Sequence, residues 1–330
     1  MLVRVAAIFA VSVALASLSS ASGAARPFRI ALIVRIGAHP TTTDVGGLFY
    51  LGFIRAAHQP GVTGRVVEVG PSGDPGPALE LLVRQRYDLI FPTFFYGHSL
   101  ESFIARHPRT TFLIADGPGR SPKAPANELT TVFRPQEAAY LAGYLAALAA
   151  DRRKAPHTVG AVGGWTIPQV TSLIAGFRAG ARAADPQIRV LIGYSHDFAD
   201  PVKCAAVARE QIARGASVVF NVAGDCGYGA LMTAKQLGVW GVGVDADQSP
   251  LGDFILTSVL KHEGPGIMRA INAVRRHTFP SSGTLILDYR NGGVGLGKIS
   301  PKVPRALIRR LERVRAALAA GRIVVPGSLK

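Results

Sequence analysis

The stretch Thr158–Ala184, TVGAVGGWTIPQVTSLIAGFRAGARAA, contains the pattern that sets the fold class. Its first five residues form a short β-rich run that is followed by two glycines. Pro168 stands where a proline opens the first turn of a helix, which we expect to continue to about Ala184. A second β-rich run, Arg189–Tyr194, follows at once. This order predicts a strand–helix–strand unit with parallel strands.

The same alternation extends along the chain in both directions. We expect further strands at Phe28–Val34, Arg65–Val69, Tyr87–Phe91, Thr110–Ala115, Ala216–Val222, Val239–Val244, Ile255–Leu260 and Thr284–Tyr289. We expect further helices at Gly46–Ala57, Ala78–Arg86, Ser99–Arg106, Gln136–Ala150, Pro201–Ala213, Gly229–Gln236, Pro265–Arg276 and Arg305–Arg315. Apolar strands that alternate with helices are typical of parallel sheets covered on both faces. We therefore predict an α/β fold with two doubly wound lobes.

Length and composition are those of a globular protein. The chain has 330 residues, of which 48% are hydrophobic and 18% charged, and this excludes a disordered chain. Its two cysteines exclude a small scaffold held by disulfides. At roughly 100–200 residues per domain, two domains are expected.

The chain carries a formal net charge of +16. A strongly basic balance accompanies binding to nucleic acid, anionic lipid or an acidic ligand, but it also describes a basic surface in solvent. The basic residues are not interleaved with aromatic ones, as they are in sites for single-stranded nucleic acid. We therefore expect no nucleic-acid partner.

The first 25 residues have the pattern of an export signal. Arg4 precedes the apolar run Val5–Leu18, and small residues follow to Ala25. We expect cleavage between Ala21 and Ala25 and a periplasmic mature protein. No cysteine lies in this region, so we expect no lipid anchor. In an oxidising compartment a bond between the two cysteines, at positions 204 and 226, is permitted, and the sequence leaves its formation open.

Candidate binding residues gather where the predicted strands end. In open parallel sheets, ligands bind at the carboxyl ends of the strands. Carboxylates accept hydrogen bonds from hydroxyls, and aromatic faces suit flat rings. The residues at such ends are Phe95, Asp116, Phe198, Gly224, Asp245 and Lys261.

Catalytic motifs are incomplete. Gly292–Lys298 has the glycine and lysine spacing of a phosphate-binding loop, but Ile299 replaces the hydroxyl residue that binds magnesium. Gly193–Asp197 resembles a nucleophile elbow without its closing glycine. No His or Cys pattern predicts a metal site. We therefore predict neither an enzyme nor a bound metal or cofactor.

Several motifs together carry a resemblance to a known family. They are Glu137-Ala-Ala-Tyr140-Leu-Ala-Gly143, Val159-Gly-Ala-Val-Gly-Gly-Trp165-Thr-Ile-Pro168, Ala175-Gly-Phe177-Arg-Ala-Gly180, Val219-Phe-Asn-Val-Ala-Gly224, Gly243-Val-Asp245-Ala-Asp247-Gln248, Leu256-Thr-Ser-Val-Leu-Lys261, Gly292-Gly-Val-Gly-Leu296 and Gly321-Arg-Ile-Val-Val-Pro326. In combination they are similar to the basic membrane protein family, the purine-nucleoside-receptor-like substrate-binding proteins of ABC importers. The resemblance covers nearly the whole mature chain.

The resemblance implies a two-lobed type I periplasmic binding fold that closes on a purine nucleoside. We expect residues 26–132 and about 247–285 in the first lobe, and residues 133–246 and about 286–330 in the second. By motif position Asp116 would bind ligand and Phe198 would stack on the base. Gly224 would supply a backbone contact, and Asp245 and Lys261 would bind the ribose.

The sequence departs from the family at Pro40–Gly47, where the family has a Ser-Phe-Asn motif that contacts the base. Neither the Phe nor the Asn is present, so base recognition is left open. Asp44 and Phe95 are our candidates to replace these contacts, and Trp165 completes the candidate site.

We therefore expect a monomeric substrate-binding protein that delivers a small polar ligand to an ABC permease in the inner membrane. The leading candidate for this ligand is a purine nucleoside. The alternatives are a partner that presents ligand to a membrane sensor, a binder of a non-nucleoside metabolite, and a nucleoside-processing enzyme.

Overall fold

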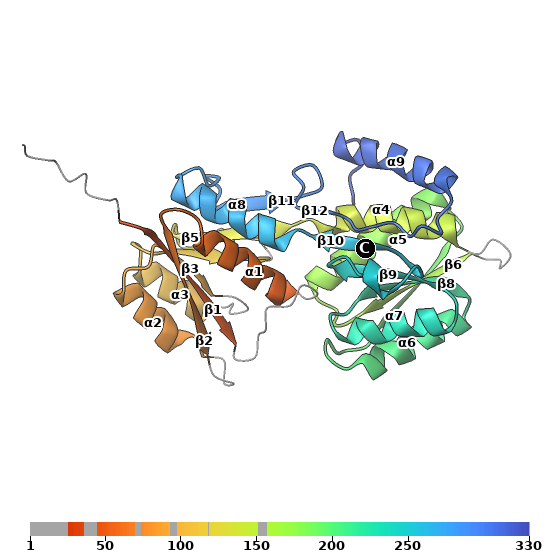
Figure 1. Cartoon of the computed structure of the whole chain (residues 1–330), viewed down its shortest axis with the longest axis horizontal. Helices are drawn as coiled ribbons and strands as arrows, with labels where there is room; N and C mark the ends of the chain where they lie inside the picture. The colour runs from red at the N-terminus through yellow and green to blue at the C-terminus, as the bar shows by residue number, and fades with distance from the viewer. Residues whose placement is uncertain are drawn as a thin grey trace, which may run out of the picture.

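The computed structural model describes residues 26–35, 45–69, 74–92, 98–117, 119–150 and 157–329. Within these ranges the strands form two separate sheets of six strands each. Figure 1 shows the two sheets in two lobes that lie side by side along the long axis of the molecule. The predicted α/β fold with two lobes is confirmed.

The first lobe contains a fully parallel sheet with the strand order β11-β5-β4-β3-β1-β2. Its strands are β1 (Phe28–Arg35), β2 (Val62–Val69), β3 (Leu89–Pro92), β4 (Thr111–Ile114), β5 (Glu128–Phe133) and β11 (Thr284–Leu287). Its helices are α1 (Val45–Ala57), α2 (Gly76–Arg84), α3 (His98–Arg106) and α8 (Glu263–Arg275).

Both faces of this sheet are buried, which explains the continuous apolar run of β1. Ile30 and Leu32 belong to the core formed with α1 and α8. Ala31 and Ile33 point to the other side, into the core formed with α2 and α3. Successive side chains of a strand point to opposite faces, so a strand covered on both faces must be apolar throughout.

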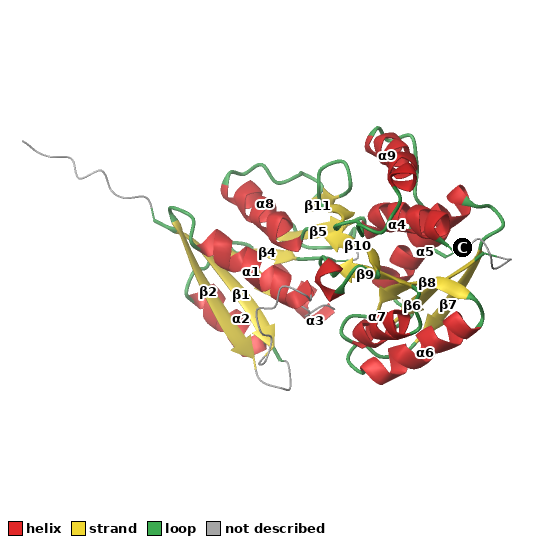
Figure 2. Ribbon diagram, turned by 45° about the vertical axis from the view of Figure 1, so that its right-hand side comes forward, coloured by secondary structure: helices red, strands yellow, loops and turns green. Residues whose placement is uncertain are grey.

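The second lobe contains a sheet with the order β12-β10-β9-β8-β6-β7, in which β12 alone runs antiparallel to its neighbour. Its strands are β6 (Thr158–Gly163), β7 (Arg189–Tyr194), β8 (Ala216–Val222), β9 (Trp240–Asp245), β10 (Ile255–Lys261) and β12 (Val294–Leu296). Its helices are α4 (Pro135–Ala149), α5 (Pro168–Ala184), α6 (Pro201–Ala213), α7 (Cys226–Gln236) and α9 (Arg305–Ala319). Helices α6 and α7 cover one face, and α4, α5 and α9 cover the other (Figure 2).

Helices α4 and α5 pack with their backbones nearly in contact. A Cβ atom added to Gly180 would lie 1.8 Å from the carbonyl oxygen of Tyr140, and one added to Gly143 would lie 2.0 Å from that of Phe177. Only glycine allows this approach. Gly143 and Gly180, which end two of the motifs quoted above, therefore set the distance between the two helices.

One passage of the chain between the lobes lies at a different point from the one we expected, while those near residues 133 and 287 agree with the expected bounds. We placed residues 247–285 in the first lobe, but β10 pairs with β9 and lies in the second sheet. The passage therefore follows Lys261, where β10 runs directly into α8 of the first lobe. The return passage comes after Leu287, because β11 pairs with β5 along its whole length.

The helices agree with the sequence pattern to within a few residues at most ends. The side chain of Asp200 caps α6 by accepting a hydrogen bond from the Val202 amide at 2.9 Å. Among the described helices none is both long and apolar enough to cross a membrane. The predicted export signal, residues 1–25, lies outside the described residues.

Candidate functional site

The side chain of Lys261 lies at the centre of three carboxyl groups. Its Nζ atom is 2.7 Å from Oδ2 of Asp116, 3.8 Å from Oδ1 of Asp245 and 3.9 Å from Oε1 of Glu263. Lys261 ends β10, Asp245 ends β9, and Asp116 follows β4 of the other lobe. The cluster therefore joins the strand ends of both sheets, the position at which open α/β sheets bind ligands.

Two of these carboxylates are presented by left-handed backbone. The φ angles of Asp116 and Asp245 are 51° and 64°. Aspartate tolerates this conformation better than most residues, but at an energetic cost. The Asp116 turn is secured by a hydrogen bond from its amide to Oγ1 of Thr131 at 3.2 Å, and the Asp245 turn by one from the Ala246 amide to the Val244 carbonyl at 2.8 Å. Such turns aim each carboxylate back towards Lys261.

Burial governs the ionisation of the cluster. Burial by itself lowers the pKa of the Lys261 ammonium, but the charges of Asp116, Asp245 and Glu263 hold that pKa well above its usual value. Lys261 is therefore charged. Burial, followed by the charges of Asp116 and Asp245, raises the pKa of the Glu263 carboxyl well above 4.5, against the opposing charge of Lys261. The cluster therefore combines a buried ammonium with a carboxyl group that favours its neutral form.

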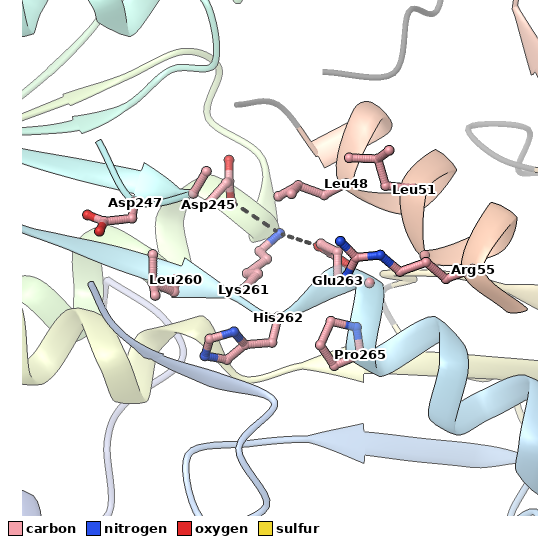
Figure 3. A pocket seen from close by; sticks show the side chains of 13 residues that line it. Leu48, Leu51, Arg55, Asp245, Asp247, Leu260, Lys261, His262, Glu263 and Pro265 are labelled. Carbon is pink, nitrogen blue, oxygen red and sulfur yellow. Dashed lines mark ion pairs between the residues drawn. The ribbon is translucent and has the colours of Figure 1, made fainter. Parts of the chain in front are cut away.

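A pocket of about 250 Å³ adjoins the cluster and is drawn in Figure 3. Helix α1 supplies one wall through Leu48 and Leu51. The opposite side consists of residues 245–247 after β9 and residues 260–265 around the end of β10. Polar groups at one end and leucines along the wall suit a ligand that has both hydroxyls and apolar surface.

A second group of candidates lies together in the second lobe. The ring of Phe198 packs over the backbone of Gly164, because a Cβ atom added there would lie 2.3 Å from the ring. Gly224 has a φ of 56°, and a Cβ atom there would lie 3.2 Å from the Phe198 carbonyl oxygen. Trp165 contacts His196 edge to face, with ring centroids 5.5 Å apart. Phe198 and Trp165 are 40% and 46% exposed, so part of each ring is accessible to a ligand.

The loop that carries Phe198 is held at several points. Asp197 accepts hydrogen bonds from the Ala199 amide at 2.8 Å and from Nζ of Lys203 at 2.7 Å. These bonds hold the pKa of Asp197 far below its usual value. The Phe198 carbonyl accepts from the Cys226 amide at 2.9 Å, and Cys226 is bonded to Cys204. The disulfide that the sequence left open thus ties α6 to α7 directly beside this loop.

The structure therefore brings together two sets of predicted residues: Asp116, Asp245 and Lys261 in one, and Phe198, Gly224 and Trp165 within the same set of loops of the second lobe. Asp44 and Phe95 lie outside the described residues. Glu263 was not predicted, because an acidic residue in the first turn of a helix ordinarily serves the helix dipole. Glu263 follows Lys261 by two residues, and this spacing was the one feature of the sequence that could have indicated a place in the site.

The described residues contain no group of three or more His, Cys, Asp or Glu side chains that could hold a metal ion.

The partial phosphate-loop motif at Gly292–Lys298 forms part of the second sheet. Its residues Val294–Leu296 form β12, which pairs with β10, and the next helix begins only at Arg305. Lys298 therefore does not stand at the start of a helix, as a phosphate-binding loop requires.

The family model and the relatives of known sequence that match this chain indicate the same family. Residues 50–328 match the model of the PnrA-like ABC transporter substrate-binding proteins. The chain is 31% identical over 233 residues to the ABC transporter nucleoside-binding protein BmpA of Lactococcus lactis subsp. cremoris (strain MG1363), covering 65% of this chain. The match spans 64% of that relative, so it covers less than two thirds of its length. Basic membrane protein A1 of Borrelia garinii subsp. bavariensis is 30% identical over 230 residues, which are 68% of this chain and 67% of that protein.

The fold is also shared with solved structures. An ABC transporter solute-binding protein from Aeropyrum pernix K1 superposes with a TM-score of 0.73 at 22% sequence identity. The superposition covers 91% of this chain and 94% of that one. At this identity the likeness concerns the fold alone.

Proposed function

The chain belongs to the PnrA-like family of ABC transporter substrate-binding proteins, and on that premise we propose that it binds a purine nucleoside between its lobes and delivers it to an ABC permease. The family consists of substrate-binding proteins, not enzymes. The observation that carries the proposal is the 2.7 Å contact between Lys261 of one lobe and Asp116 of the other, beside Asp245. It puts acceptors for hydroxyl groups where the two lobes meet.

Each part of the ligand then has a partner of suitable chemistry. Asp245 accepts hydrogen bonds from two ribose hydroxyls, and Lys261 orients the ligand and the carboxylates by charge-assisted bonds. Phe198 stacks on the base, and a stack of this kind contributes roughly 1–3 kcal/mol. Because the ligand contacts both lobes, it favours the closed arrangement over the open one.

The proposal includes the compartment in which the protein acts and its partner. The leader-like residues 1–25 support export, and the disulfide between Cys204 and Cys226 fits an oxidising compartment such as the periplasm. The partner is a permease in the inner membrane, and the protein acts as a monomer without nucleic acid.

Thermal unfolding of the exported chain with a panel of nucleosides, bases, sugars and amino acids tests the ligand class. A ligand at 100 times its Kd adds about 2.7 kcal/mol to the stability, which shifts the midpoint by several degrees. Inosine, guanosine or adenosine should give such a shift. A shift with another class alone would refute the nucleoside and identify a different metabolite.

The site map is tested with two alanine variants. Asp245→Ala should weaken nucleoside binding more than Asp44→Ala, because the loss of Asp245 leaves buried ligand hydroxyls unpaired. Calorimetric titration of both variants measures the difference. Small and equal losses would contradict the placement of the ribose.

A further inference from the structure

The Glu263 carboxyl has no hydrogen-bond partner among the described residues. Its side chain is fully buried, and within the described part of the chain neither Oε1 nor Oε2 forms a hydrogen bond. It nevertheless lines the pocket between α1 and the end of β10 (Figure 3). A buried polar group without a partner destabilises the folded protein, so its presence requires an explanation.

Pairing with Lys261 does not provide that explanation. Lys261 already has Asp116 at 2.7 Å and Asp245 at 3.8 Å, whereas Glu263 lies 3.9 Å away. Two carboxylates are sufficient to balance one ammonium. Glu263 adds a third carboxyl to a buried site that gains nothing in charge balance from it.

Helix packing does not require the carboxyl either. Next to Glu263, the first turn of α8 touches α1 so closely that a Cβ atom on Gly52 would lie 2.6 Å from the Cα atom of Gly264. This backbone contact fixes the start of α8 and thereby holds the Glu263 side chain in the pocket wall. An apolar side chain of similar size would satisfy the same packing.

We propose that Glu263 is a ligand-contacting residue whose carboxyl binds a hydroxyl group of the sugar part of the ligand. The inference rests on the proposed function and names a contact beyond Asp245 and Lys261. A neutral carboxyl donates from its O–H and accepts at its carbonyl oxygen, and a hydroxyl can do both in return. One ligand hydroxyl therefore satisfies Glu263.

The charges around the pocket favour a hydroxyl over an anion. The groups that face Glu263 are Asp116, Asp245 and Lys261, and Arg55, Asp247 and His262 line the same pocket. Burial and the neighbouring carboxylates raise the pKa of Glu263, which keeps it neutral and able to donate. As pH rises through this pKa the donor is lost, so binding should weaken.

Two substitutions and a matched control test the contact. Inosine binding is measured by calorimetry for the wild type, Glu263→Leu, Glu263→Gln and Glu128→Gln. Glu128 is a buried carboxyl in β5 that does not line the pocket. We expect Glu263→Leu to raise the Kd roughly tenfold, the loss of one buried hydrogen bond. Glu263→Gln can still donate and accept, so its loss should be smaller and its affinity should not fall with rising pH. Glu128→Gln should match the wild type.

Deoxy ligands identify the hydroxyl. The 2′-, 3′- and 5′-deoxy forms of the nucleoside are titrated against wild type and Glu263→Leu. The form that lacks the partner of Glu263 should bind more weakly to the wild type but suffer no further loss in the variant. Equal additional losses with all three forms would overturn the contact.

Unfolding without ligand provides an independent readout. If Glu263 is unpaired in the free protein, Glu263→Leu should raise the melting midpoint. A lower midpoint with unchanged Kd would overturn the inference and assign Glu263 a structural role, for example through a buried water. A wild type that binds no nucleoside would instead refute the proposed function, and the contact to the sugar with it.

Discussion

Replacement of Lys261 by methionine is the sharpest test of how the two lobes are joined. The lysine side chain is 6% exposed, and its Nζ atom has carboxyl oxygens at 2.7, 3.8 and 3.9 Å. Methionine has a similar length, so little cavity is created and the main effect is electrostatic. Loss of one partner of a buried ion pair costs about 3–5 kcal/mol, because the remaining charge is left without compensation. We therefore expect Lys261→Met to be destabilised by this amount.

The dependence on pH separates this cause from simple loss of packing. The raised pKa means that the stabilisation from Lys261 is fully present below the ordinary lysine value of 10.5 and is lost only as pH rises through the higher folded value. At neutral pH the full loss is therefore seen in the variant. Methionine does not titrate, so the difference in stability between the wild type and the variant should shrink only as the pH rises above about 10.5, whereas a simple loss of packing would not depend on pH.

Urea unfolding followed by circular dichroism, without ligand, measures the effect. Lys302→Met, at an exposed lysine, is the matched control and should unfold like the wild type. Asp116→Asn should destabilise the wild type but partly restore Lys261→Met, because it removes an uncompensated charge. A free energy of unfolding for Lys261→Met within about 0.5 kcal/mol of the wild type would refute the reasoning, since that is the range of ordinary surface substitutions.

Two further predictions concern the second lobe. Cys204→Ala/Cys226→Ala should lose about 2–4 kcal/mol of stability, because the bond closes a loop across 22 residues. A reducing agent should lower the melting midpoint of the wild type and leave that of the variant unchanged, and equal midpoints for the two proteins would contradict the bond. Gly180→Ala should lower the melting midpoint through an overpacking cost of about 1–3 kcal/mol, because the new methyl group would lie 1.8 Å from the Tyr140 carbonyl oxygen. Gly327→Ala, which meets only the Gln136 side chain at 3.7 Å, is the control, and a loss as large there would show that the α4–α5 contact is not the cause.

The long buried strands were predictable because both of their faces are covered. β8 is buried along all seven of its residues, and such a continuous apolar run predicts a buried strand. β5 was missed because its threonines read as polar, yet Thr130 and Thr131 are buried and Oγ1 of Thr130 donates to the Ile114 carbonyl at 3.1 Å. β12 has three residues, including a glycine, and forms only by pairing with β10. Neither strand has a local signal strong enough to stand without its tertiary partner.

The sequence pattern also could not predict that the chain crosses from the second lobe to the first after Lys261. We placed it near residue 247, at the polar turn that follows β9. That turn instead returns the chain to the same sheet, where β10 continues the parallel register beside β9. A strand–turn–strand pattern does not say which sheet the second strand joins. That choice depends on which neighbouring edge buries more apolar surface.

The site was predictable only as far as the strand-end rule extends. That rule brings Asp116, Asp245 and Lys261 into consideration one by one. It does not say that the ammonium of one lobe meets a carboxylate of the other, because that contact depends on how the lobes pack. Glu263 follows no strand-end rule at all. A buried orientation of its side chain follows from the close contact of α1 with α8, which no single segment encodes.

These features together indicate a protein that gives up stability at the proposed binding site. Two aspartates hold left-handed backbone, and the Glu263 carboxyl is buried without a hydrogen bond to any residue that the structure describes. Each departure costs free energy, and both Asp245 and Glu263 line the same pocket beside Lys261. A sequence selected for stability alone would replace Glu263 with an apolar residue. Substitutions that stabilise the free protein here should therefore be the ones that weaken ligand binding, the trade-off expected where polar groups are held for a ligand and not for the fold.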